Sequence, residues 1–148
     1  MRVYLDNCVF NRPFDDQGQL IISLQTQAKL AIQEQIRAGA LDLVWSYILD
    51  SENLANPFET RRAFVAVWKS FAILDLEESV QIFTWAEEIA ARGIREKDAL
   101  HISCARAGSC DYFVTTDRRI LREKAFGPLR IVDPIAFLLE KEEGKHGD

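Results

Sequence analysis

The amino-acid sequence predicts a single α/β domain built on a mostly parallel sheet of about five strands with helices on its faces. Short apolar runs alternate along the chain with segments whose apolar residues recur at helical spacing, which is the pattern of this fold class. The sequence contains no internal repeat, low-complexity segment or linker rich in Gly, Pro or Ser. A chain of 148 residues with 48% hydrophobic side chains is long enough to bury one sizeable core. We therefore assign residues 1–142 to one domain and residues 143–148 to a polar C-terminal tail.

The first third of the chain is predicted to hold two strands and a long helix between them. Residues 3–5 (VYL) form a short apolar run typical of a buried strand. Residues 11–19 contain Pro, Gly and Asp and are predicted to form a loop. Apolar residues recur at helical spacing over residues 20–38, and Gly39 is a residue type that commonly ends a helix. The second strand follows at residues 41–45.

The middle of the chain is predicted to be mainly helical. Ser46 is positioned as the N-cap of a helix, and that helix ends by Asn56 because a residue before proline avoids helical backbone angles. Two further helices are predicted near residues 58–71 and 77–91, forming a hairpin around a short extended piece at residues 73–76.

The last third repeats the alternation of helix and strand. A helix is predicted from Asp98 to Gly108, a strand at residues 112–115, and a short helix near residues 118–124. A last strand at residues 131–132 precedes a final helix over residues 134–142, with proline at its first position.

Composition narrows the possible functions. The net charge of −5, from 18 basic and 23 acidic side chains, argues against broad, charge-driven coating of nucleic acid and suits a basic protein partner. With three cysteines, no CxxC pair and two histidines, a zinc site is not expected, and the thiols fit a reducing compartment. The apolar stretches are shorter than a membrane span, and the N-terminus lacks the apolar block of a signal peptide. We expect a cytoplasmic protein with no membrane partner.

Four acidic residues fall where an open α/β sheet would gather them. Asp6 and Asp117 follow predicted strands, Glu52 lies on the helix after the second strand, and Asp98 opens a helix. Strand ends and helix starts at one edge of a parallel sheet are where such folds build their sites. We therefore expect these four carboxylates to share a site.

Each of these acids also has a simpler structural explanation. Asp6, Asp98 and Asp117 stand where a carboxylate can cap a turn or a helix. Glu52 can be an ordinary exposed helical residue, and Asp50 is a rival for its role. Position alone does not separate these readings, and the case for a site depends on the four acids taken together.

A cluster of carboxylates points to a divalent cation. Carboxylates brought close together repel one another unless a cation lies between them. Mg²⁺ and Mn²⁺ prefer oxygen ligands and keep several waters, so three or four carboxylates suffice. Such an ion stabilises charge that develops on phosphate oxygens, which makes phosphodiester hydrolysis the chemistry best suited to the site.

Neighbouring polar residues are predicted to support the acidic site. We assign a supporting role behind the acids to Asn7, Ser46 and Thr116, and phosphate contacts to Arg12 and Arg118.

Other side chains are assigned to packing. His101 is expected to pack on its helix, and several aromatic residues are expected in the core: Trp45, Phe64, Trp68, Phe71, Phe83 and Trp85. The motifs GxGxxG, GxxxxGK[ST] and GxSxG do not occur, so dinucleotide-binding, P-loop and α/β-hydrolase functions have no support.

These motifs together resemble PIN domains, and specifically the ribonuclease toxins of the VapC type. The resemblance spans about residues 2–140 and is carried by VYLDNCVF, SYILDSENL, KDALHISCARAGSCDYFVTTD and IVDPIAFL. In that family the glutamate follows a Ser or Thr by six residues, as Glu52 follows Ser46, which favours Glu52 over Asp50. The chain departs from the pattern at Asn7, where the family usually has Ser or Thr, in a longer loop at residues 11–19, and in the Arg118-Arg119 pair after the fourth acid.

The resemblance implies a PIN-like three-layer sandwich with the activity of a Mg²⁺- or Mn²⁺-dependent endoribonuclease. Asp6, Asp98 and Asp117 would hold the metal, and Glu52 would hold it or orient the attacking water. It also implies a homodimer and, for a toxin, a cognate antitoxin protein that covers the site.

Two other classes of protein remain as alternatives. The first is a catalytically inactive PIN-like module that docks RNA or protein. The second is another phosphate enzyme, but no lysine ends a later strand as a phosphoacceptor requires, and Asp6-Asn7-Cys8 replaces the DxD of a dehalogenase-like phosphatase.

Overall fold

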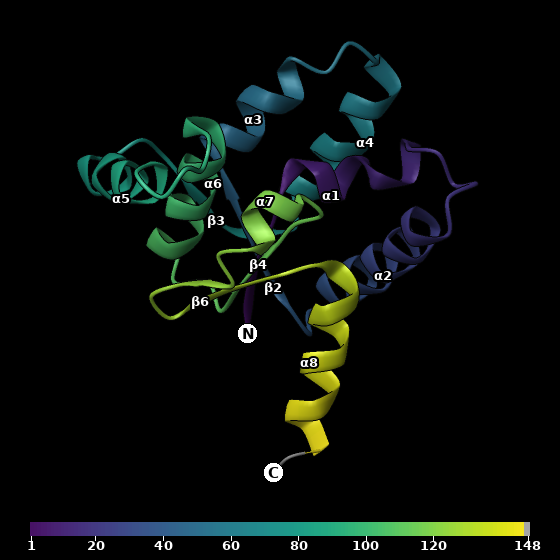
Figure 1. Cartoon of the computed structure of the whole chain (residues 1–148). Coiled ribbons are helices and arrows are strands. Elements are labelled where there is room, and N and C mark those ends of the chain that lie inside the picture. Colours follow the sequence, from purple (N-terminus) through teal and green to yellow (C-terminus); the bar gives the residue numbers. More distant parts are fainter. Residues whose placement is uncertain (147–148) are drawn as a thin grey trace.

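A sheet of parallel strands, with one short antiparallel strand at its edge, forms the centre of the molecule (Figure 1). The computed structural model describes residues 1–146, and side-chain surroundings as far as residue 143. The strands within this range are β1 (Arg2–Leu5), β2 (Asp42–Ser46), β3 (Ala72–Leu76), β4 (Tyr112–Val114), β5 (Ala125–Phe126) and β6 (Leu129–Val132). They lie in the order β3-β2-β1-β4-β6-β5, and β5 runs antiparallel to β6.

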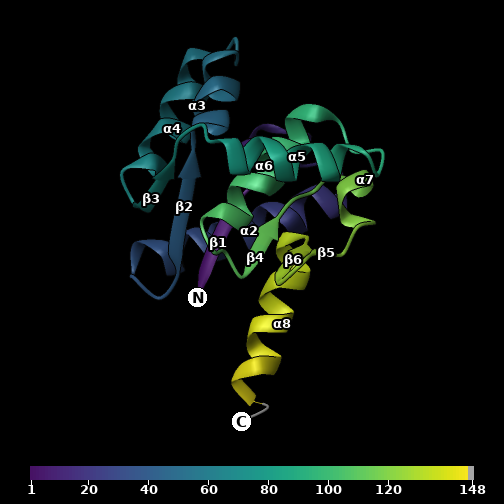
Figure 2. The same cartoon turned by 90° about the vertical axis from the view of Figure 1, so that its left-hand side faces the viewer.

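Helices cover both faces of this sheet, so the domain has three layers. Helices α5 (Val80–Ala90) and α6 (Glu96–Ala107) lie on one side, and α2 (Leu20–Arg37) and α8 (Pro134–His146) on the other, as the two perpendicular views in Figures 1 and 2 agree. The shorter helices α1, α3, α4 and α7 span Asn7–Asn11, Tyr47–Leu54, Glu59–Lys69 and Arg118–Leu121. Three of them, α1, α3 and α7, begin close after the carboxyl ends of strands β1, β2 and β4.

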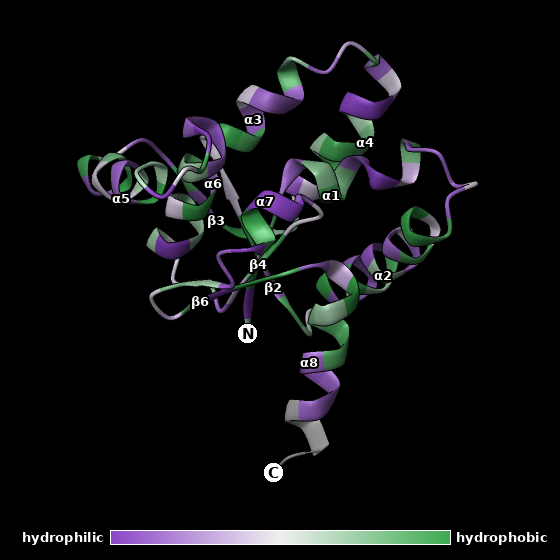
Figure 3. Cartoon of the chain, viewed as in Figure 1, coloured by the Kyte–Doolittle hydropathy of each residue, from purple (hydrophilic) through white to green (hydrophobic). Residues whose placement is uncertain are grey.

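The core lies where the central strands meet the helices. Strand β1 is buried from Val3 to Leu5, as expected for a strand covered on both faces. The ring of Tyr4 stacks on Phe113 of β4 with centroids 5.5 Å apart, and Phe10 of α1 packs against Trp45 of β2 at 5.3 Å. Helices α2 and α5 alternate hydrophobic and hydrophilic residues along their length (Figure 3), and each buries an apolar set of residues, Ile22, Ala28, Ile32 and Ile36 on α2 and Ile82, Ala86 and Ile89 on α5.

The structure confirms the predicted α/β class and adds one strand to the five expected. The additional strand is β5, a two-residue segment that the sequence pattern did not indicate. It forms a tight hairpin with β6 through Gly127, whose φ of 59° suits glycine. The piece predicted at residues 73–76 is strand β3, and it pairs in parallel with β2 at the sheet edge.

Several predicted boundaries differ from the observed ones. Helix α6 begins at Glu96, so Asp98 lies in its first turn and does not open it. The predicted loop at residues 11–19 contains a short 3-10 helix, Arg12–Phe14. Helix α8 continues to His146 instead of ending near residue 142, and residues 147–148 of the expected polar tail lie outside the described range.

No helix in the described part of the chain combines the length and apolar character that crossing a membrane requires.

Candidate functional site

The four predicted acids all reach one edge of the sheet. Asp6 directly follows β1, and Asp117 follows the neighbouring strand β4, while Glu52 is carried by the helix that begins where β2 ends. Asp98 comes to the same edge from the first turn of α6. The chain runs outward from β1 in one direction and from β4 in the other, so the site lies at the topological switch point of the sheet.

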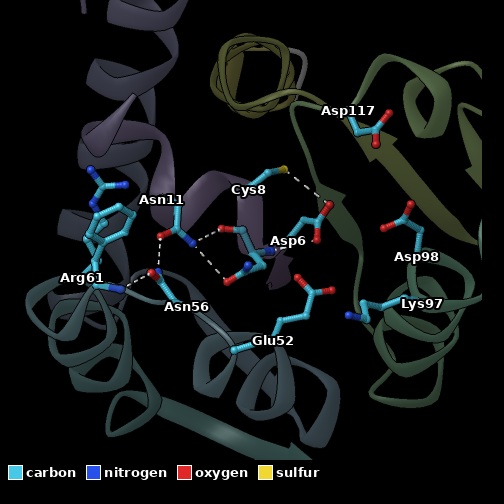
Figure 4. A pocket seen from close by; sticks show the side chains of 12 residues that line it. Asp6, Cys8, Asn11, Glu52, Asn56, Arg61, Lys97, Asp98 and Asp117 are labelled. Atoms are coloured by element: carbon cyan, nitrogen blue, oxygen red, sulfur yellow. Dashed lines mark hydrogen bonds between the residues drawn. The ribbon is translucent and has the colours of Figure 1, made fainter. Parts of the chain in front are cut away.

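These acids line one open pocket of about 430 Å³. Figure 4 shows their carboxyl groups pointing toward a shared space from different elements. The lining residues are Asp6, Asn7, Cys8, Asn11, Glu52, Ala55, Asn56, Phe58, Arg61, Lys97, Asp98 and Asp117.

Asp6 is buried and firmly held. One of its carboxylate oxygens accepts a hydrogen bond from the backbone N–H of Asn7 at 2.8 Å. The other accepts from Thr115 Oγ1 at 2.9 Å and from Cys8 Sγ at 3.4 Å. Burial raises the pKa of Asp6 above its ordinary value, although His101 and the Thr115 hydrogen bond act in the opposite direction. These hydrogen bonds fix the carboxylate in position, and only 5% of the residue is exposed.

Glu52 is held by a buried chain of hydrogen bonds. His101 Nε2 lies 2.6 Å from Glu52 Oε1, and His101 Nδ1 lies 2.6 Å from the hydroxyl of Tyr4. That hydroxyl lies 2.6 Å from Ser46 Oγ, which also accepts from the backbone N–H of Leu49. Burial acts to raise the pKa of Glu52, but the hydrogen bond and charge of His101 outweigh it and lower the pKa below its ordinary value. Ser46 thus supports Glu52 indirectly, through Tyr4 and His101.

Asp98 and Asp117 are less enclosed than Asp6. Asp117 accepts a hydrogen bond from the backbone N–H of Arg119 at 2.8 Å, so it also caps α7. Burial raises the pKa of Asp98 to about 6, and repulsion from Asp6 and Asp117 adds to this effect. The acids therefore act on one another electrostatically across the pocket.

The donor set fits Mg²⁺ or Mn²⁺ by its chemistry, although the side chains do not form a closed metal cage. Among residues 1–146, no three His, Cys, Asp or Glu side chains are gathered closely enough to hold an ion between them. The pocket nevertheless offers carboxylate oxygens from four elements, and these ions bind through such oxygens while keeping several waters. The raised pKa of Asp98 supports this fit, because a cation would relieve the repulsion that contributes to it.

The cations at the pocket are not the ones predicted. Arg12 does not line it, and instead donates to Gln25 and forms an ion pair with Asp15 at 3.0 Å. Arg118 is also absent from the lining, where Arg61 and Lys97 stand instead. Arg61 lies outside the sequence motifs, and Lys97 opens the motif KDALHISCARAGSCDYFVTTD beside Asp98, but no sequence pattern marks either residue as a cation of the pocket.

The structure also places polar residues at the site that sequence reasoning missed or assigned differently. Thr115, not Thr116, donates a side-chain hydrogen bond to the Asp6 carboxylate, while Thr116 donates its backbone N–H to Cys8 Sγ at 3.4 Å.

His101 was expected to pack on its helix, and it is fully buried, yet it contacts Glu52. Its position three residues after Asp98, one helical turn away, was the signal that it faces the same side. Asn7 contributes its backbone N–H to Asp6 and a side-chain hydrogen bond that helps to lower the pKa of Glu52.

Comparison with known proteins supports the fold. No protein-family model matches the sequence. No curated protein matches it in sequence either. Among solved structures, the chain is similar to a chain in the crystal structure of VapBC2 from Rickettsia felis bound to a DNA fragment from the VapBC2 promoter. The TM-score is 0.56 and the sequence identity is 14%, and the match covers 88% of this chain and 97% of the other. The chain therefore has the PIN-like α/β fold that its sequence motifs predicted.

Proposed function

We propose that this protein is a Mg²⁺- or Mn²⁺-dependent endoribonuclease that hydrolyses RNA phosphodiesters. The observation that carries the proposal is the single pocket lined by Asp6, Glu52, Asp98 and Asp117, each from a different element. The raised pKa of Asp98 supports it, because mutual repulsion of this kind is what a bound cation would relieve. The PIN-like fold is consistent with this chemistry, but a fold by itself does not establish an activity.

Three of the acids are suited to hold the metal. Asp6, Asp98 and Asp117 would bind it directly or through water. When bound, the ion supplies activation of water and stabilisation of charge on the phosphate oxygens. Thr115 and Asn7 keep the Asp6 carboxylate in place through their hydrogen bonds, so it need not reorganise on binding.

Glu52 is suited to orient the attacking water. Its pKa is lowered mainly through His101, so the carboxylate is ionised at neutral pH and accepts a hydrogen bond from water. The contact with His101 restricts its movement, which favours an in-line approach to phosphorus. Lys97 and Arg61 line the same pocket and are suited to bind phosphates of the RNA strand. The expected products carry 5′-phosphate and 3′-hydroxyl ends.

We further propose that the protein is a cytoplasmic toxin that forms a homodimer and is controlled by a cognate antitoxin. The fold similarity to a VapBC2 structure supports this, and the net charge of −5 suits a basic antitoxin segment that enters the acidic pocket. Expression of the protein alone should slow growth, and co-expression of the antitoxin should restore it. A monomer in sedimentation experiments whose expression never slows growth would contradict both parts.

The direct test is a cleavage assay on a panel of structured and single-stranded RNAs. Wild type, Asp98→Asn and the control Asp50→Asn would be compared with Mg²⁺, with Mn²⁺ and with EDTA. Asp50 lies on the same helix as Glu52 but contacts Trp45 and Lys69 instead of the pocket. We expect cleavage by wild type and Asp50→Asn only with metal, and none by Asp98→Asn. Full activity of a folded Asp98→Asn or Asp6→Asn protein would refute the assignment.

The alternative function is an inactive module that docks RNA or protein. It is favoured by the fact that Asp6 and Asp117 also serve as helix caps, which gives these acids a role without a metal. If no RNA is cut and neither Mg²⁺ nor Mn²⁺ changes the melting temperature, while RNA still binds, this alternative replaces the nuclease.

A further inference from the structure

A second cavity lies between helices α2 and α4, separate from the acidic pocket. It has a volume of about 450 Å³, and its lining shares no residue with that of the acidic pocket. The lining residues are Phe10, Pro13, Phe14, Lys29, Leu30, Gln33, Arg37, Phe64, Val65, Val67 and Trp68. Cations and aromatic rings are present, but no carboxylate lines this cavity.

Helix α2 presents a buried polar stripe toward this region. Gln25, Lys29 and Gln33 follow one another at intervals of four residues and therefore share one helical face. Their exposed fractions are 6%, 6% and 3%. An amphipathic helix normally buries apolar residues on such a face, so three polar side chains there need partners.

Two of these three side chains lack a partner among the residues that the structure describes. Gln25 accepts a hydrogen bond from Arg12 Nε at 2.9 Å. Gln33 Nε2 is buried with no hydrogen-bond partner in the described range, and no hydrogen bond or ion pair to Lys29 is formed there. Burial lowers the pKa of Lys29 to about 8. An amide N–H that is buried without an acceptor is costly, and so is a lysine charge in a partly desolvated site without a paired carboxylate. An anionic acceptor in this cavity would relieve both costs.

The remaining walls suit a flat apolar body. Phe14 and Phe64 face each other with ring centroids 6.2 Å apart, and the guanidinium of Arg37 lies 5.5 Å from the ring of Trp68. Phe64 was expected in the core, but it is 60% exposed and lines this cavity. The cavity thus combines aromatic walls with a positive charge at its buried side.

We propose that this cavity binds a small organic acid, with an apolar ring-bearing body between α2 and α4 and a carboxylate paired with Lys29 and Gln33. The cavity volume lies within the range typical of small-molecule sites. The absence of acidic residues from the lining leaves the positive charge of Lys29 and Arg37 for the ligand. The site does not depend on the proposed nuclease function.

The test compares two probes of nearly the same shape, one anionic and one neutral. The affinities of 1-naphthoate and of its neutral isostere 1-naphthamide would be measured by calorimetry and by quenching of tryptophan fluorescence. Trp68 lines the cavity, so the Trp68→Phe variant would identify its share of the quenching. We expect wild type to bind naphthoate about tenfold or more tightly than the amide, as for a charge-assisted pair.

Matched lysine variants locate the charge that is responsible. Lys29→Met keeps most of the buried apolar stem and removes the charge from a partly desolvated site, so the protein should remain folded. It should bind naphthoate and naphthamide equally. Lys124→Met, at an exposed position outside the cavity, should retain the wild-type preference. Gln33→Leu should weaken naphthoate binding severalfold with little effect on the amide.

Three results would overturn the proposal. The first is equal affinity of the wild type for naphthoate and naphthamide. The second is a Lys29→Met variant that still prefers naphthoate as the wild type does. The third is no binding of either probe at millimolar concentration. Sedimentation at the same protein concentrations would show whether a second copy covers the cavity, and a dimer that excludes the probes would also overturn it. None of these readouts uses RNA cleavage, so their outcome is separate from that of the proposed function.

Discussion

At the scale of single residues, this protein keeps carboxylates partly buried and close to one another. Burial raises the pKa values of Asp6 and Asp98, while His101 makes Glu52 the exception by lowering its pKa. Environments that push neighbouring pKa values in opposite directions are a common property of catalytic sites. The raised pKa values of Asp6 and Asp98 mean that ionising these two groups destabilises the folded state, and this cost can be measured.

Asp98→Asn should stabilise the protein at neutral pH when no metal is present. The pKa of Asp98 is raised to about 6 from 3.8, so the folded state binds more protons than the unfolded state between these values. Stability therefore falls as the pH rises through this window, and the penalty is fully present above pH 6. Because Asp98 is partly exposed, we expect a gain of only about 1–2 kcal/mol for the variant at pH 7, and little at pH 4. Urea unfolding in EDTA at both pH values measures this difference.

Glu96→Gln is the matched control for that experiment. Glu96 lies in the same first turn of α6 but is exposed and does not line the pocket. It should lose a few tenths of a kcal/mol through the helix dipole at pH 7. If Asp98→Asn is no more stable than wild type at pH 7, or if its gain is the same at pH 4, the electrostatic account of this site is wrong.

Tyr4→Phe should weaken both stability and the proposed activity. The Tyr4 hydroxyl joins Ser46 Oγ to His101 Nδ1, and its removal leaves the buried ring nitrogen without that partner. We expect a loss of about 1–2 kcal/mol in the free energy of unfolding. Cleavage should fall about tenfold because Glu52 is less well held, whereas the thermal shift with Mn²⁺ should persist. Tyr112→Phe, on β4 and away from the pocket, should leave cleavage unchanged.

At the scale of elements, the site depends on how helices begin at the ends of strands. Ser46 ends β2, caps α3 through the N–H of Leu49 and bonds Tyr4, so one side chain links the strand, the helix and the His101 chain. Ser79 caps α5 in the same way through the N–H of Ile82, but it has no contact with the acidic pocket. Comparing variants of these two serines therefore separates the loss of a helix cap from the loss of the hydrogen bond to Tyr4.

Ser46→Ala and Ser79→Ala should differ in activity more than in stability. Each variant loses an N-cap, which costs about 1 kcal/mol. Ser46→Ala also removes a hydrogen-bond partner of the buried Tyr4 hydroxyl, and should cost about 1 kcal/mol more. Only Ser46→Ala should reduce RNA cleavage. Equal cleavage by the two variants would show that the hydrogen-bond chain through Tyr4 does not position Glu52.

At the scale of the whole molecule, the parallel sheet brings distant parts of the chain to one edge. The acids stand at positions 6, 52, 98 and 117, yet all four line the same pocket. Their number at one sheet edge predicts that the folded protein binds divalent cations that the unfolded chain does not.

Mn²⁺ should therefore raise the melting temperature, and EDTA should reverse the effect. A ligand at about one hundred times its Kd stabilises the folded state by roughly 2.7 kcal/mol. Asp6→Asn should lose most of this shift, whereas Asp50→Asn should keep it, because Asp50 does not line the pocket. Differential scanning calorimetry across a Mn²⁺ titration is the measurement, and an equal shift in both variants would place the ion elsewhere.

Much of the fold and of the candidate site was readable from sequence because it depends on local properties. The run VYL, the capping position of Ser46 and the spacing from Ser46 to Glu52 each involve only a few neighbouring residues. Acids that follow parallel strands arrive at the same edge by geometry alone, so Asp6 and Asp117 could be placed before their surroundings were known.

Other features were decided only by tertiary structure. Tyr4 and His101 are 97 positions apart, and Glu52 and His101 are 49 apart, so no local pattern connects them. The same holds for the joining of β3 to the sheet, which depends on its pairing with β2. Lys29 has the sequence surroundings of an ordinary exposed helical lysine, and only the packing of α1 and α4 against α2 buries it. The sequence by itself determined the order along the chain of five strands, of most helices and of the four acids, since these depend on hydrophobic period and strand direction. Burial and hydrogen-bond partners were left to the folded structure, because they depend on contacts between segments that the chain brings together only when it folds.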